Sequence, residues 1–458
     1  MLAYPLMIAG AIGLFLLVRA AGVTLVAPPP AVSGDTAPGA VPGNADVLLH
    51  VLLALVVVII AARALGALCK RLHQPPVIGE VIAGLLLGPS FLGALSPAAM
   101  GYLLPPSAAP YLSILAQIGV ILFMFLVGLE LDTGELRHRT HATVAISHAS
   151  IVVPFVLGST LALGLYPRLS TSDVPFTVFA LFLGVSLSVT AFPVLARILT
   201  DRGMSKTPLG VVALTCAAVD DVTAWCLLAF LMAVAKARTS GVLITFGATG
   251  LYLAFMLIVA RPLIARAVRL QELRKSVSQT AFAVVVVGLL LSTLATEATG
   301  IHAIFGAFLL GALIPHDSRL ARDLHHKLGD VVVVLLLPAF FAFTGMRTQV
   351  GLVRGAAHWL LFGVILATAF LGKFGGSFLA ARLSGFGSRD AASLGILMNT
   401  RGLMELIVLN LGLDLHILSP TLFAMLVLMA IVTTLATTPV LQLLARTDAA
   451  PDGEPARS

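Results

Sequence analysis

The chain has 458 residues, of which 59% are hydrophobic and only 11% are charged. Soluble domains carry about 25% charged residues, so a water-soluble protein is excluded and a lipid bilayer is the expected solvent. The net charge of +7 does not indicate nucleic-acid binding, because the basic residues lie in short loops between apolar runs, where they set topology. The three cysteines form neither a disulfide framework nor a metal-binding spacing.

Apolar runs long enough to cross a bilayer recur along the chain. They predict an all-α polytopic membrane protein with about thirteen transmembrane helices, near 47–68, 76–95, 111–130, 141–166, 176–199, 208–235, 242–268, 278–297, 301–315, 331–349, 357–382, 389–412 and 420–445. A further apolar run at 2–26 precedes a linker rich in Pro, Gly and Ala. We interpret this run as an extra helix or uncleaved anchor, with a signal peptide as the alternative. The expected parts are therefore an N-terminal segment and flexible linker (1–46), a membrane domain (47–445) and a short tail (446–458).

Basic residues gather in alternate loops, and such loops are usually cytoplasmic. The basic set comprises Lys70, Arg71, Arg137, Arg139, Arg202, Lys206, Arg266, Arg269, Arg274, Lys275, Arg319, Arg322, Lys327, Arg382 and Arg389. The other set of loops holds only Arg168, Lys236, Arg238, Arg347 and Arg354. This asymmetry predicts a cytoplasmic C-terminus. We also expect a multi-pass protein of the plasma membrane. No glycine-rich phosphate-binding motif occurs, so neither nucleotide nor another cofactor is expected.

Two carboxylates lie where lipid surrounds the chain. Asp220 and Asp221 are adjacent near the middle of 208–235, and each costs roughly 2.5–3.5 kcal/mol at the bilayer centre. Neighbouring residues on a helix point about 100° apart, so one carboxylate can pair with a cation while the other faces a water-filled cavity. The alternative is a pair kept only for helix packing, although a neutral residue would pack at lower cost.

Lys373 is the expected charge partner of this pair. It lies mid-span in 357–382, about ten residues from the basic end at Arg382. The alternative, a lysine whose ammonium reaches the membrane surface, requires a longer side chain than this position allows.

Two apolar runs are predicted to be broken helices. In 176–199, Pro193 frees the backbone carbonyl of Val189, and Ser188 and Thr190 supply nearby oxygens; a simple proline kink is the alternative. The run 389–412 is interrupted by Asn399, Thr400, Arg401, Gly402 and Glu405. Broken backbone at this depth survives only where protein or a water-filled cavity covers it. For this second run a purely structural Arg401–Glu405 pair at i,i+4 stays open as the alternative.

The two broken runs occupy equivalent positions in two trios of helices, 141–235 and 357–445. The distribution of basic residues places the start of the first trio inside the cell and that of the second outside. Two similar units of opposite orientation are typical of an inverted-repeat transporter with its binding site at the membrane midplane.

At these residues the sequence resembles the second monovalent cation:proton antiporter family, in particular the branch of plant cation/H+ exchangers. The resemblance covers about residues 47–445, and its motifs are specific in combination. They are QPPVIGEVIAGLLLGPSFLG (74–93), GVILFMFLVGLELD (119–132), SVTAFPVLARILT (188–200), AAVDDVTAWCLLA (217–229), LPAFFAFTGMRTQ (337–349) and MNTRGLMELIVLNL (398–411).

The resemblance implies an inverted-repeat sodium/proton antiporter fold with two crossed broken helices, and a homodimer. It implies that Asp221 binds cation or proton, that Asp220 pairs with Lys373, and that Thr190 contributes an oxygen. Glu130 and Arg401 match charged family positions. Many members of the plant branch carry Asn at the position of Asp220, and a paired Asp-Asp usually marks charge-moving exchange. The membrane domain also resembles glutathione-gated potassium efflux systems, without their nucleotide-binding tail.

We therefore predict a secondary active transporter, not an enzyme, that exchanges Na+ or K+ for H+ by alternating access. A carboxylate in a dry cavity holds a proton or a dehydrated cation, but not readily both, and this competition is enough for exchange. The alternatives are a channel-like potassium efflux protein, a non-transporting membrane sensor or partner subunit, and a proton-coupled exporter of a small organic molecule. Na+ and K+ are not distinguished by the sequence, because selectivity depends on cavity geometry and ligand field.

Overall fold

The computed structural model describes residues 3–29, 44–130, 141–236, 242–272, 278–299 and 302–446, and its regular structure in these ranges is entirely helical. Eleven helices there are long and apolar enough to cross a membrane, and one bent pair, Ser388–Met398 with Leu403–Asp414, makes twelve. Each of the thirteen expected ranges contains a helix, although the one at Ala303–Leu313 is short. The all-α polytopic expectation is confirmed. Linker residues 30–43, the tail from 447, and the loop residues Arg137, Arg139, Arg238, Arg274 and Lys275 lie outside the described residues.

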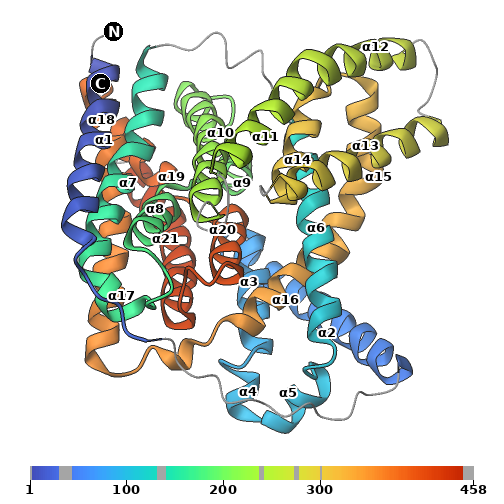
Figure 1. Ribbon diagram of the computed structural model, residues 1–458, viewed down its shortest axis with the longest axis horizontal. Helices are drawn as coiled ribbons and strands as arrows, with labels where there is room; N and C mark the ends of the chain where they lie inside the picture. The colour runs from blue at the N-terminus through green and yellow to red at the C-terminus, as the bar shows by residue number, and fades with distance from the viewer. Residues whose placement is uncertain are drawn as a thin grey trace, which may run out of the picture.

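The helices form two bundles, which lie on opposite sides of Figure 1. The crossing bundle, on the left, contains α7 (His141–Leu169), α8 (Phe176–Ser188), α9 (Phe192–Asp201), α10 (Pro208–Lys236), α17 (Gly355–Phe370), η5 (Leu371–Gly375), α18 (Gly376–Leu383), α19 (Ser388–Met398), α20 (Leu403–Asp414) and α21 (Pro420–Arg446). The scaffold bundle, on the right, contains α2 (Asn44–Arg71), α3 (Pro76–Leu87), α4 (Leu92–Leu95), α5 (Pro97–Leu103), α6 (Ala109–Glu130), α11 (Val242–Phe255), η2 (Met256–Ala260), α12 (Arg261–Glu272), α13 (Gln279–Ala298), α14 (Ala303–Leu313), α15 (Arg319–Val331), η3 (Val332–Leu336), α16 (Leu337–Arg347) and η4 (Val350–Leu352).

Small residues allow the scaffold helices to pack closely. A Cβ at Gly128 of α6 would lie 2.3 Å from the carbonyl oxygen of Phe308, and one at Gly311 of α14 would lie 2.3 Å from that of Phe125. Both contacts are with backbone, which cannot move aside easily. In a bilayer the hydrophobic effect does not drive helices together, because lipid tails are as apolar as the side chains. Close approach of the backbones instead stabilises helix pairs through van der Waals contacts.

The N-terminal apolar run forms α1 (Ala3–Gly22), which packs along α7 and α8. Val18 and Ala27 are buried there, and the backbone N–H of Ser172 donates to the carbonyl of Pro28 at 3.0 Å. The segment is thus attached to the crossing bundle in this structure.

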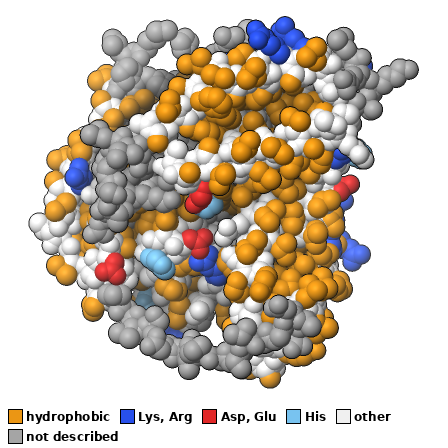
Figure 2. Space-filling model, turned by 45° about the vertical axis from the view of Figure 1, so that its right-hand side comes forward, with side chains coloured by type: hydrophobic (Ala, Val, Ile, Leu, Met, Phe, Trp, Pro, Cys, Tyr) orange, Lys and Arg blue, Asp and Glu red, His pale blue; other side chains and the backbone are white. Residues whose placement is uncertain are grey.

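The exterior is apolar, as a lipid-facing surface requires. On α13, for example, Leu290, Leu291 and Leu294 are exposed. Figure 2 shows hydrophobic side chains over most of one face, with charged side chains of both signs gathered near its middle.

Candidate ion-binding site

The two broken helices meet at their breaks. α8 ends at Ser188 and α9 begins at Phe192, while α19 ends at Met398 and α20 begins at Leu403 with a bend of 43°. The backbone N–H of Ala191 donates to the carbonyl of Thr400 at 3.0 Å, so the two breaks lie side by side. Pro193 falls in the first turn of α9, where a missing N–H is tolerated.

Arg401 stabilises the crossing by binding the end of α8. Its Nη1 donates to the carbonyl of Ser186 at 3.0 Å and its Nη2 to that of Leu187 at 2.8 Å. These are carbonyls of the last helical turn, which have no partner within the helix and carry its negative dipole end. Nη1 also lies 2.9 Å from Oε2 of Glu405, so the i,i+4 pair left open above is present, together with a cap on a second helix.

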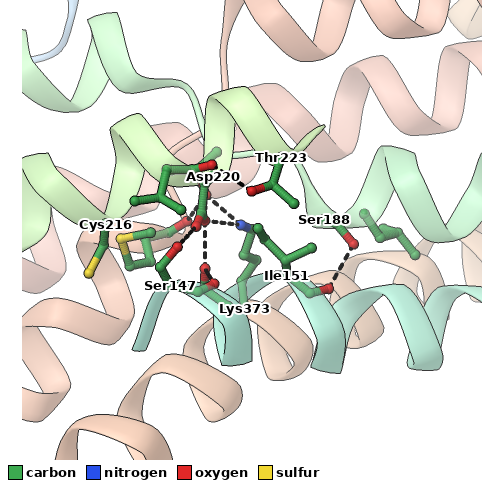
Figure 3. Close-up of polar contacts among 12 residues, drawn as sticks. Ser147, Ile151, Ser188, Cys216, Asp220, Thr223 and Lys373 are labelled. Carbon is green, nitrogen blue, oxygen red and sulfur yellow. Dashed lines mark hydrogen bonds and ion pairs between the residues drawn. The ribbon is translucent and has the colours of Figure 1, made fainter. Parts of the chain in front are cut away.

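Asp220 is the most fully bonded carboxylate of the crossing (Figure 3). Its Oδ1 accepts from Ser147 at 2.8 Å, and its Oδ2 accepts from Ser150 at 2.5 Å and from Thr190 at 2.9 Å. The Nζ of Lys373 lies 3.1 Å from the same Oδ2. Three hydroxyls and one ammonium therefore compensate the desolvation of this charge.

Lys373 is fully buried and does not reach the membrane surface. It lies in the π-helical turn η5, and its Nζ also donates to Oγ1 of Thr190. The preceding Gly372 permits this approach, because a Cβ there would lie 2.8 Å from the Cα of Pro154 on α7. π-helical turns of this kind often occur at functional sites.

Asp221 differs from its neighbour in having no hydrogen bond. It is buried, and neither of its carboxylate oxygens has a partner. The carboxylate faces the backbone N–H of Phe192 at the start of α9, but the distance and angle do not reach those of a regular hydrogen bond. A buried carboxylate without partners is costly unless it is protonated or coordinates a cation. Further unpartnered buried atoms at the second break are the side-chain amide of Asn399, Oγ1 of Thr400, Nε of Arg401 and Oε1 of Glu405.

A cavity of about 880 Å³ leads to the first break from the end of the molecule where Lys70 lies. Its wall includes both bundles and ends at Ala191, Phe192 and Pro193, beside Asp221. Its charged lining residues are Arg63, Lys70, Glu80, Glu130 and Arg197. Water and a hydrated cation can therefore come close to the buried carboxylates from this side, whereas the hollow between the described residues at the opposite end measures about 40 Å³.

The other sequence candidates lie at different depths. Ser188 is directed away from both aspartates, since its hydroxyl bonds the carbonyls of Gly184 and Ile151 (Figure 3). Glu130 lies at the cavity mouth, half exposed, and pairs with His325 on α15 at 2.8 Å.

Sequence reasoning missed three polar residues of this region. Ser147 and Ser150 lie three residues apart, on one face of α7. Two hydroxyl side chains at this spacing in an apolar run could have been recognised from the sequence as candidates for the site. Glu80 is a buried carboxylate in the apolar helix α3, with Arg63 nearby, and it lines the cavity. Like Asp220 and Asp221, Glu80 is an acidic residue inside an apolar run, and the sequence alone could have identified it on that ground.

Comparisons with known proteins agree on one family. The family model described as "Sodium/hydrogen exchanger, transmembrane" matches residues 50–446. The chain is 44% identical over 404 residues to Na(+)/H(+) antiporter NhaS4 of Synechocystis sp., covering 87% of this chain and 97% of that protein. It is 40% identical over 405 residues to Cation/H(+) antiporter 20 of Arabidopsis thaliana, covering 86% of this chain. The match covers 48% of that plant protein, so the chain spans about half its length.

Among solved structures, the fold resembles the sodium proton antiporter MjNhaP1 from Methanocaldococcus jannaschii. The TM-score is 0.63 at 15% identity, over 87% of this chain and 99% of that chain. This likeness shows a shared antiporter fold.

The Asp220–Lys373 pair predicts a stability pattern. Asp220→Asn leaves a buried ammonium without its carboxylate, which should lower the free energy of unfolding by about 3–5 kcal/mol. Asp220→Asn combined with Lys373→Gln removes both charges and should recover a large part of that loss. The measurement is the apparent melting temperature in detergent, with the exposed Asp390→Asn as control. An equal loss in the single and double variants would contradict the pairing.

Proposed function

The chain belongs to the sodium/hydrogen exchanger family, which makes it a monovalent cation/proton antiporter and not an enzyme, and we propose that the exchange takes place at the buried carboxylate of Asp221. The observation that carries this proposal is the contrast between two adjacent aspartates. Asp220 has four bonded partners, whereas Asp221 has none.

This contrast supports different roles for the two carboxylates. The bonds to Asp220 hold its side chain in one position, so it serves as the fixed charge of the site. The oxygens of Asp221 are free to take either a proton or a dehydrated Na+ or K+. One carboxylate cannot hold both at once, so the two ions compete, and alternating access converts that competition into exchange.

Thr190 and the unpartnered side chains of Asn399 and Thr400 are proposed to complete the site with neutral oxygens. Both breaks leave backbone carbonyls out of helical bonding, and such oxygens suit alkali cations. Arg401 and Glu405 support the break rather than bind the ion. Ser188 supports the end of α8, and Pro193 starts the helix whose first N–H faces Asp221.

Lys373 is proposed to give the exchange its charge movement. A cation entering beside Asp221 brings positive charge close to Lys373 and weakens its attraction to Asp220. Release of a proton from the ammonium, together with one from Asp221, would make two protons per monovalent cation. One net charge would then cross the membrane in each cycle.

The two bundles are proposed to move against each other, with the 880 Å³ cavity as the cytoplasmic entrance. Its mouth carries Lys70, on the side where basic loops gather, which supports a cytoplasmic C-terminus. The proposed location is the plasma membrane. The N-terminal helix α1 is proposed to be retained and to move with the crossing bundle.

A homodimer is proposed through the exposed apolar face of the scaffold bundle, and cross-linking in membranes tests it.

Two other functions are less well supported. Channel-like potassium efflux requires a continuous path, but the described residues close the end opposite the cavity. A non-transporting sensor does not explain Asp221, because a buried carboxylate without hydrogen-bond partners destabilises the protein and such a sensor would gain nothing from it.

Asp221→Asn should abolish exchange with little loss of stability, because no hydrogen bond is broken. The measurement is proton flux in vesicles under an imposed gradient of Na+, K+, Li+ or Rb+ in turn. Asp390→Asn, which removes an exposed carboxylate, should exchange normally. Full exchange by Asp221→Asn would refute the assignment of the binding carboxylate.

Neutralising the pair tests the charge movement. Vesicles containing the parent protein should develop a membrane potential during exchange, whereas Asp220→Asn combined with Lys373→Gln should exchange electroneutrally. A potential-sensitive dye measures the difference. Unchanged charge per cation in the double variant would rule out the role proposed for Lys373.

A cysteine at Ala196 tests the orientation. Ala196 lines the cavity on α9, and Cys69, Cys216 and Cys226 are first replaced by alanine. We expect a membrane-impermeant maleimide to label Ala196→Cys from the cytoplasmic face. Labelling from the opposite face alone would reverse the proposed topology.

A further inference from the structure

A polar network joins the two bundles at the end opposite the cavity. On the scaffold bundle it involves Thr344 and Arg347, in the last turn of α16. On the crossing bundle it involves Asn410 and Asp414, near the end of α20. Arg347 Nη1 lies 2.6 Å from Oδ1 of Asp414, and Nδ2 of Asn410 donates to Oγ1 of Thr344 at 2.8 Å.

The network extends from the buried interface to solvent. Thr344 and Asn410 are buried, whereas the side chains of Arg347 and Asp414 are 22% and 46% exposed. Arg347 Nη1 also donates to Oδ1 of Asn410 at 3.4 Å, and its guanidinium lies over the ring of Phe343 at 5.1 Å. Asn410 thus takes partners from both scaffold residues. If the bundles separated here, water would have to replace those partners.

The two ends of the bundle interface differ sharply. At the Lys70 end the bundles are separated by the 880 Å³ cavity. At the Asp414 end the described residues enclose a hollow of about 40 Å³, lined by Ala116, His302, Asn410 and Asp414 among others. The network therefore belongs to the arrangement in which the site is open towards Lys70.

We propose that Arg347, Asp414, Asn410 and Thr344 form a gate that closes the Asp414 side of the site and must release for that side to open. This inference rests on the proposed exchange by alternating access. None of the four is among the residues proposed to bind the ion; they are positioning residues that set which side Asp221 faces. They stabilise one of two states, so their loss shifts the population towards the other.

The partial exposure of the ion pair suits a gate that opens in every cycle. A fully buried pair is difficult to separate, because each charge would be left without a partner in apolar surroundings. At Arg347 and Asp414, water can solvate both charges as they part, so the pair is weak enough to break repeatedly.

The test uses two single cysteines in the background without native cysteines. Ala196→Cys reports access from the Lys70 side and Ala116→Cys, buried beside the gate, reports access from the Asp414 side. Each is combined with Asp414→Asn, and labelling rates with an impermeant maleimide are measured from both faces. The matched control is Asp390→Asn, an exposed aspartate outside the gate.

With Asp414→Asn we expect Ala116→Cys to label about two- to fivefold faster, as loss of a half-exposed pair implies, and Ala196→Cys to label more slowly. Arg347→Gln should give the same opposed changes, and it replaces Asp414→Asn if that variant does not accumulate. The exchanged pair, Arg347→Asp with Asp414→Arg, should restore part of the parent ratio. Unchanged rates at both cysteines would overturn the gate, and so would parallel changes, which indicate general loosening.

The labelling result is separate from the proposed function. Labelling needs no ion flux, whereas exchange by the parent protein in vesicles tests antiport directly. Opposed labelling changes in a parent that does not exchange would support the gate and reject exchange at Asp221. Normal exchange with unchanged labelling would reject the gate alone.

Discussion

The buried carboxylate of Asp220 is the constraint around which the crossing is arranged. One ammonium and three hydroxyls reach it from α7, from the first break and from η5. A charge at this depth is tolerated only with such partners. None of these donors bonds Asp221, whose two carboxylate oxygens have no partner.

The broken helices create a second electrostatic problem, because each break leaves helix ends inside the membrane. Arg401 satisfies the end of α8 by donating hydrogen bonds to two of the last carbonyls of that helix. The carboxylate of Glu405 partly neutralises the positive charge of the guanidinium. The second break is further held by α21, since Oγ1 of Thr434 accepts from the N–H of Arg401 and donates to its carbonyl. These hydrogen bonds hold the two breaks in place. The surrounding helices therefore keep their positions although some oxygen atoms at the breaks have no partner.

The arrangement of the two bundles determines from which end of the molecule water and ions reach this site. The cavity beside Ala191 brings water to one side of the breaks, and the network of Arg347, Asn410 and Asp414 closes the other. A carboxylate that holds either a proton or a cation becomes an exchanger only when such access is one-sided. In the proposed mechanism the bonded aspartate, the unbonded aspartate and the gate all contribute to one-sided access.

The sequence by itself determined the membrane class, the helix ranges and the family, and it singled out Asp220, Asp221 and Lys373 as candidate site residues. Hydropathy is a local property, and an ionisable side chain within an apolar run is conspicuous wherever it occurs. Only the tertiary structure decided that Asp221 has no hydrogen-bond partner, that Ser147 and Ser150 donate to Asp220, and that Ser188 points elsewhere. Asp220 and Lys373 are 153 residues apart in the chain, and Arg401 reaches carbonyls more than 200 residues away. Contacts over such separations depend on how helices pack and rotate, which no local pattern of residues specifies.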